Sequence, residues 1–186
     1  MSYIINENNI PTLAIGFTRG LDLLGNSIAF CRCGWKAAKD KSFPTHAFLF
    51  NRDEGRLFAT EEQPCGLVEK SLAEYCTDKN RIVAVYHWHG FDDPDRIDAA
   101  LRKLADIRAN GDRNSKYDFK ALFSFIPLVG KWFKPDPAKM ICSESVATIL
   151  KGAGATWIKN PVVTPDQLEK IIHESGECKA VLGYYL

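Results

Sequence analysis

Cys142 is the side chain in this sequence best placed to act as a nucleophile. It follows a proline-rich segment and opens the run 140–150, in which Val146, Ile149 and Leu150 recur at helical spacing. This pattern predicts a helix with Cys142 at or beside its N-cap. A thiol there faces free backbone N–H groups and the positive end of the helix dipole, and both favour the thiolate that cysteine chemistry needs. The alternative is a small buried hydrophobic residue, as most lone cysteines are.

His46 is the histidine for which the sequence predicts a carboxylate partner. The aromatic-rich runs 45–51 and 56–61 flank a four-residue loop that ends in glycine, which predicts a β-hairpin. With that loop length, His46 lies directly opposite Glu61, at a Cβ–Cβ distance of about 4.5–5.5 Å. Glu62 would then lie on the other face, and it remains the alternative because a one-residue slip would exchange the two glutamates. An imidazole oriented by a carboxylate is the base that activates a cysteine nucleophile.

The other three histidines are weaker candidates for chemistry. His87 and His89 alternate on a predicted strand, so both rings lie on one face and could ligate a metal ion. No third ligand is evident beside them in the sequence, and we interpret them as a satisfied or partly exposed pair. His173 is predicted to lie on the surface of an amphipathic helix. We therefore expect no metal site and no cofactor.

The elements that must position these residues indicate a mixed α+β chain. β-branched and aromatic runs predict strands, and apolar residues at three- and four-residue steps between capping and stop signals predict helices. Strands are predicted at 10–17, 45–51, 56–61, 66–70, 81–89 and 180–186. Helices are predicted at 71–75, 92–111, 117–125, 142–150 and from Thr164 onward, and a short helix within 21–35 is predicted to begin near Asn26–Ser27.

Composition limits the classes of function. The chain of 186 residues has 46% hydrophobic and 25% charged residues, which is typical of one globular domain. A net charge of +1 argues against a nucleic-acid footprint or a polybasic membrane patch. No stretch approaches the roughly 18 apolar residues of a membrane helix, and no signal peptide is readable, so we expect synthesis in a cytoplasm. The six scattered cysteines are expected to be mostly free thiols.

Five segments resemble, in the same order, the circularly permuted branch of the NlpC-type papain-like superfamily. That branch places its histidine strand first and its nucleophile helix last. Its motifs are a Ser/Thr-His strand, a carboxylate near the start or end of the next strand, a Tyr-Asp-Phe segment and a Cys-Ser-Glu-x-Val helix. The matching segments lie at 45–50, 58–68, 117–119, 141–146 and 164–168.

The resemblance implies a single papain-like α+β domain over residues 1–186, with an antiparallel sheet or half-barrel packed against helices. It implies that Cys142 is the nucleophile, His46 the base and Glu61 the orienting acid. Glu62 stands where the family usually has alanine, so Glu62 stays open as the third member. Tyr117 resembles the tyrosine that the family places beside its cysteine, and its alternative is a core aromatic.

Three functions follow from this resemblance. The first is a thiol peptidase or amidase acting on a peptide, amide or acyl-ester substrate, with cell-wall peptide as the leading class. Delivery to a cell wall would then need a phage lysis or injection apparatus or a bacterial secretion system. The second is a lipid-directed acyltransferase or phospholipase, because the branch also resembles lecithin:retinol acyltransferase in motif order. The third is a non-catalytic binding or virion-associated module with an inherited pocket.

Overall fold

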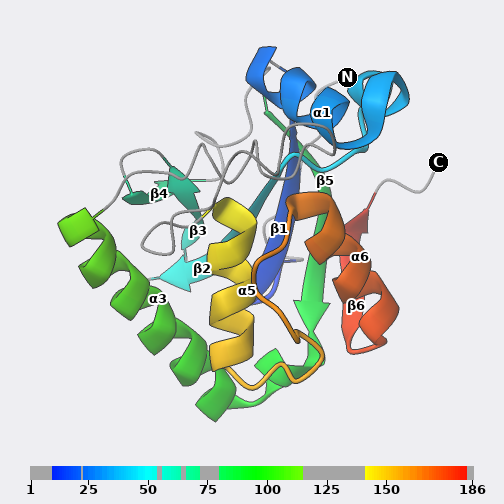
Figure 1. Ribbon diagram of the computed structural model, residues 1–186. Coiled ribbons are helices and arrows are strands. Elements are labelled where there is room, and N and C mark those ends of the chain that lie inside the picture. The colour runs from blue at the N-terminus through cyan, green and yellow to red at the C-terminus, as the bar shows by residue number, and fades with distance from the viewer. Residues whose placement is uncertain are drawn as a thin grey trace.

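The computed structural model describes residues 10–21, 23–53, 56–63, 66–71, 80–114 and 141–183 (Figure 1). Its centre is an antiparallel sheet with the strand order β4-β3-β2-β1-β5-β6. The strands are β1 (Leu13–Gly20), β2 (His46–Asp53), β3 (Arg56–Gln63), β4 (Gly66–Ser71), β5 (Asn80–Trp88) and β6 (Cys178–Gly183). The predicted α+β class is confirmed.

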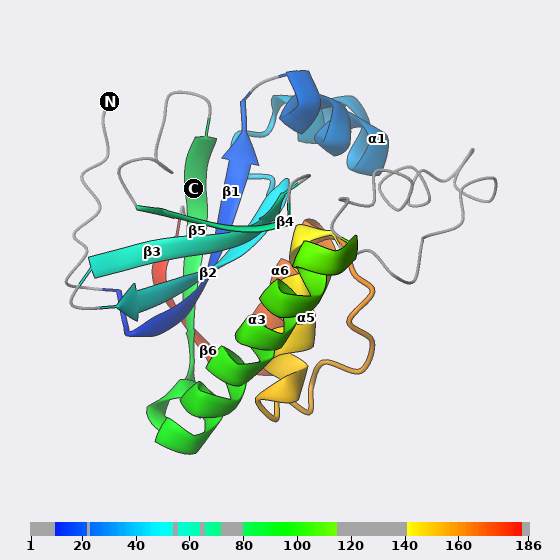
Figure 2. The ribbon, with the colours of Figure 1, turned by 90° about the vertical axis from the view of Figure 1, so that its left-hand side faces the viewer.

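The helices follow from local signals in the sequence and gather on one side of the sheet. Figure 2 shows α3, α5 and α6 together on that side, and α1 beside the end at which β1 finishes. Among the described residues, no helix combines the length and the apolar composition that a bilayer crossing requires. The helices are α1 (Leu23–Lys39), the 3₁₀ turn η2 (His89–Asp92), α3 (Pro94–Asn114), α5 (Cys142–Gly152) and α6 (Pro165–Ser175).

Strand alternation divides the apolar residues of the sheet between its two faces. One face contributes residues such as Ile15 of β1 and Leu49 of β2 to a core that also contains the predicted stripe of α5. The other face carries a separate cluster that includes Phe48 and Phe50 of β2. The α5 stripe consists of Val146, Ile149 and Leu150, each at most 2% exposed. The core thus fixes α5 against the strands that begin the chain.

The predicted hairpin is present, but its predicted register is wrong. The structure pairs Phe50 with Ala59 and Asp53 with Arg56, so only residues 54–55 separate the two strands. Arg52 was predicted to lie in the loop, but its N–H donates to the Thr12 carbonyl at 2.9 Å and its guanidinium donates to the Ile10 carbonyl. These contacts with the N-terminal segment extend β2 into the predicted loop. The pairing therefore shifts by two residues, so each residue of β3 stays on the face of the sheet for which it was predicted.

Two helices differ from their predicted limits. α1 begins at Leu23, before the predicted start near Asn26, runs on to Lys39 and kinks at Gly34, whose φ of 76° lies in the left-handed region. α3 continues through Gly111 to Asn114, because helical hydrogen bonding outweighs the modest cost of one glycine. The predicted helices at 71–75 and 117–125 lie outside the described residues, apart from Ser71 in β4. Predictions of strands β4, β5 and β6 and of helix α6 are confirmed within a few residues.

Candidate functional site

Helix α5 begins at Cys142, as predicted, and its first turn is closed by short backbone contacts. Ile141 is the N-cap in an extended conformation, and its carbonyl accepts the N–H groups of Glu144 and Ser145 at 3.0 and 3.1 Å. The Glu144 carboxylate reaches back and accepts the Ile141 N–H at 3.1 Å. A carboxylate in the first turn is favoured by the helix dipole. The Glu144 carboxylate therefore stabilises the start of α5.

The residues around Cys142 are buried although three of them are polar. Cys142 is 1% exposed, and Ser143, Glu144 and Ser145 are at most 7% exposed. The Ser143 hydroxyl donates to the Val163 carbonyl at 2.6 Å, which joins the start of α5 to the segment before α6. No acceptor for the N–H groups of Cys142 and Ser143 lies among the described residues. Two backbone donors therefore remain available beside the thiol, as expected for the first turn of a helix.

His46 is the first residue of β2, and the residue before it fixes the backbone there. The Thr45 N–H donates to the Thr18 carbonyl at 2.9 Å, while the Thr45 hydroxyl oxygen accepts the Gly20 N–H at 2.9 Å. Thr45 is buried, His46 is half-buried, and His46 pairs in register with Thr18 of β1. Both β2 and α5 begin at the end of the sheet near α1 (Figure 1). The structure thus brings together the two elements that carry Cys142 and His46.

The faces of β2 set a condition on any contact between these two side chains. Ala47, which follows His46, belongs to the core that contains α5, whereas Phe48 belongs to the cluster on the other face. Strict alternation assigns His46 to the face of Phe48. Contact between the His46 imidazole and the Cys142 thiol therefore requires the strand to depart from alternation at its first residue.

For the predicted acid residues Glu61 and Glu62, the structure gives the position in the sheet. Glu61 and Glu62 lie in β3, in register with Val68 and Leu67 of β4. Continuing the β2–β3 register sets position 46 opposite position 63, so the predicted direct pairing of His46 with Glu61 is wrong. The two positions become diagonal neighbours, for which Cα distances are about 7–8 Å. Tyr117 lies outside the described residues.

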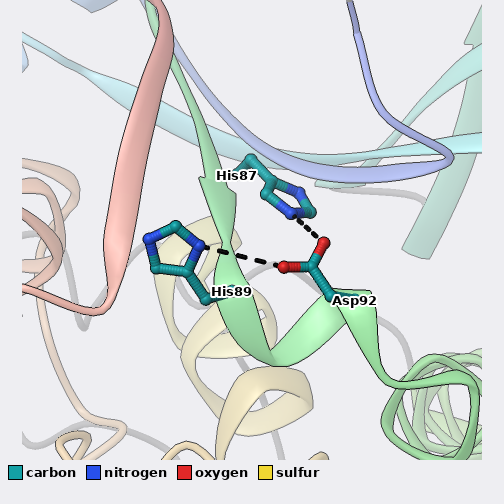
Figure 3. A group of neighbouring side chains, drawn as sticks. All are labelled: His87, His89 and Asp92. Carbon is teal, nitrogen blue, oxygen red and sulfur yellow. Dashed lines mark hydrogen bonds and ion pairs between the residues drawn. The ribbon is translucent and has the colours of Figure 1, made fainter.

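A second group of polar side chains lies where β5 ends. Figure 3 shows His87 and His89 turned toward Asp92, with His87 Nε2 at 2.8 Å from one carboxylate oxygen and His89 Nδ1 at 3.9 Å from the other. Asp92 comes from the turn η2, which follows β5 directly. Our prediction missed Asp92 because it assigned this residue to the start of the helix that follows the strand. The turn brings it back, and the spacing His-x-His-x-x-Asp was the available signal.

Two further ionisable groups are perturbed by burial. Burial raises the pKa of Glu169 on α6, and its hydrogen bond from the Tyr86 hydroxyl at 3.3 Å acts in the opposite direction. Burial raises the pKa of the Cys178 thiol on β6 to about 12. Cys178 is therefore a thiol at neutral pH and a poor nucleophile.

No protein-family model and no curated protein sequence matches this chain.

Proposed function

We propose that this protein is a thiol hydrolase, a peptidase or amidase of the permuted papain-like type, in which Cys142 attacks an acyl carbonyl. His46 is the base that takes the thiol proton, and Glu61 orients the imidazole, with Glu62 as the alternative. The Cys142 thiolate forms a thioester as the leaving amine takes the proton from His46. Water then cleaves the thioester, which releases the acid and regenerates the thiol.

The observation that carries this proposal is the start of α5. The helix begins at Cys142 itself and packs on the face of β2 that carries Ala47. The base role of His46 requires its side chain to leave the face of Phe48 at the first residue of the strand. The N–H groups of Cys142 and Ser143, which have no acceptor among the described residues, are donors of the kind that an oxyanion hole uses.

Cell-wall peptide is the substrate class that the resemblance favours. The test is loss of turbidity of purified bacterial cell walls on addition of the protein, with Cys142→Ala as the inactive variant. Cys178→Ala is the matched control, because Cys178 is the other cysteine whose side chain the structure describes. We expect Cys142→Ala to abolish the turbidity loss and Cys178→Ala to keep it. Equal rates for wild type and Cys142→Ala would refute the assignment of the nucleophile.

The third member is tested by comparing Glu61→Gln with Glu62→Gln in the same assay. Removing the group that orients a catalytic imidazole costs on the order of 10²–10⁴-fold in rate in related triads. We expect that loss for Glu61→Gln and a much smaller one for Glu62→Gln. The reverse order would make Glu62 the orienting acid, and equal small losses would remove the carboxylate from the mechanism.

A lipid-directed acyl hydrolase is the second candidate, and the surface of α1 favours it. Phe30 and Trp35 are 50% and 66% exposed and contact each other edge to face. Lys39 lies over the Trp35 ring at 5.5 Å, and Lys36 lies next to Trp35 in the chain. Exposed aromatic side chains beside lysines are typical of helices that bind the interface of an anionic membrane.

This candidate is tested by release of fatty acid from phosphatidylglycerol vesicles. Under the lipid hypothesis, Cys142→Ala abolishes the release, and Trp35→Ser weakens it through loss of vesicle binding. Release that persists in Cys142→Ala, or no release at all from wild type, would exclude it. If neither cell walls nor vesicles are cut, and His46→Ala leaves partner binding intact, the non-catalytic module is the hypothesis that remains.

A further inference from the structure

The group formed by His87, His89 and Asp92 has the donors and the spacing of a metal site. The two histidines offer one imidazole nitrogen each and Asp92 offers one carboxylate oxygen, and these three atoms lie within 4.8 Å of one another. Nε2 of His87 and Nδ1 of His89 both turn toward the same carboxylate (Figure 3). The arrangement lies on the opposite side of β5 from the buried Trp88, at a separate place from Cys142 on α5.

The distances need only small changes to accept an ion. Ligand atoms about 2.1 Å from zinc at a tetrahedral angle are roughly 3.4 Å from each other. The observed distances are 2.8 Å from His87 Nε2 to Asp92 Oδ1 and 3.9 Å from His89 Nδ1 to the other oxygen, Oδ2, and they lie on either side of that value. Side-chain rotation of the exposed His89 and Asp92 would make both distances suitable, while the more buried His87 stays fixed by its strand.

Of the three side chains, His87 is largely buried, whereas His89 and Asp92 are exposed to solvent. His87 is 16% exposed, and its Nδ1 is buried with no hydrogen-bond partner among the described residues. Among the described residues, Asp92 is the hydrogen-bond partner of the His87 ring, through Nε2. Lys179, which pairs with His87 across β6, is exposed, so its ammonium group can extend into water.

The donor set selects the class of ion. Two imidazoles and one carboxylate suit zinc and the neighbouring late transition metals, whereas Mg²⁺ and Ca²⁺ prefer oxygen ligands alone. Three protein ligands leave a fourth tetrahedral position for water. We propose that His87, His89 and Asp92 bind one Zn²⁺ ion, which ties the end of β5 to the turn η2 and the start of α3.

The experiment titrates Zn²⁺ alone into the purified full chain and measures binding by isothermal titration calorimetry. The variants are the double variant His87→Ala/His89→Ala and the single variant Asp92→Asn. His173→Ala is the matched control, because it removes one exposed histidine from α6. All four proteins carry the same six cysteines, so zinc bound by thiols is common to all of them. Circular dichroism verifies that each variant is folded.

We expect wild type and His173→Ala to bind one more Zn²⁺ ion per chain than the double variant. Asp92→Asn should lower the affinity for that Zn²⁺ ion by about ten-fold or more, since loss of even an outer-shell partner costs about 10–100-fold in metal affinity. Because the ion binds the folded chain, it should also raise the melting temperature of wild type but not of the double variant.

Equal Zn²⁺ binding by wild type and the double variant would overturn the proposal, as would an unchanged affinity in Asp92→Asn. If the double variant is unfolded, His89→Gln replaces it, because His89 is 56% exposed and its loss disturbs no packing. Full Zn²⁺ affinity in His89→Gln would equally reject the three-ligand site.

Discussion

The hydrogen bond from Ser143 to Val163 should hold the start of α5 in place, and Ser143→Ala tests this. The hydroxyl is fully buried and donates to the Val163 carbonyl at 2.6 Å. Its loss leaves a buried acceptor without its donor, which costs about 1–3 kcal/mol in the free energy of unfolding. For a chain of 186 residues, this lowers the melting temperature by roughly 3–9 °C.

Ser42→Ala is the matched control, since the Ser42 hydroxyl also donates at 2.6 Å, to Asp40, but does so in an exposed turn. The freed Asp40 oxygen bonds to water, so the expected cost is within about 0.5 kcal/mol. Thermal unfolding followed by circular dichroism compares the two variants with wild type. Equal melting temperatures for Ser143→Ala and Ser42→Ala would show that burial adds nothing to this bond, and would refute the reasoning.

Three further predictions concern α6 and β6. Because burial raises the pKa of Glu169 above its ordinary value of 4.5, the folded chain binds more protons than the unfolded chain just above that pH. The free energy of unfolding should therefore fall as pH rises through this window, and urea titrations should find this fall reduced in Glu169→Gln. With a pKa of about 12, Cys178 should react with iodoacetamide at pH 8 on the order of 10³-fold more slowly than an exposed cysteine; an ordinary rate by mass spectrometry would contradict its burial. Gly176, with φ of 70° after α6, should tolerate Asn better than Ala, and Gly176→Ala should cost about 1 kcal/mol in urea unfolding.

The helices that carry the candidate residues were predictable because their signals are local. An apolar stripe followed by Gly152 defines α5, and Thr164 with Pro165 defines the start of α6. In α6 the Thr164 N–H donates to the Gln167 side chain at 3.0 Å, as a capping box requires. Such contacts depend on residues within one turn, so the sequence contains all of the information needed.

The hairpin register was not predictable because it depends on a distant segment. Arg52 looks like a loop residue in the sequence, but its contacts with Ile10 and Thr12 keep it in β2. The same limit applies to His46, whose partner depends on how β2 meets α5. The prediction missed the His87–His89–Asp92 group for a different reason. The turn η2 follows the strand directly and brings Asp92 back to the two histidines.

The rate of alkylation of Cys142 tests the central claim most directly. The measurement follows iodoacetamide labelling of each of the six cysteines in the folded protein at pH 7 by mass spectrometry, in wild type and in His46→Ala. The account predicts that Cys142 is labelled fastest, although it is only 1% exposed, and that His46→Ala slows Cys142 alone. Labelling of Cys142 no faster than the other cysteines, or an unchanged rate in His46→Ala, would contradict the assignment of a nucleophile activated by His46.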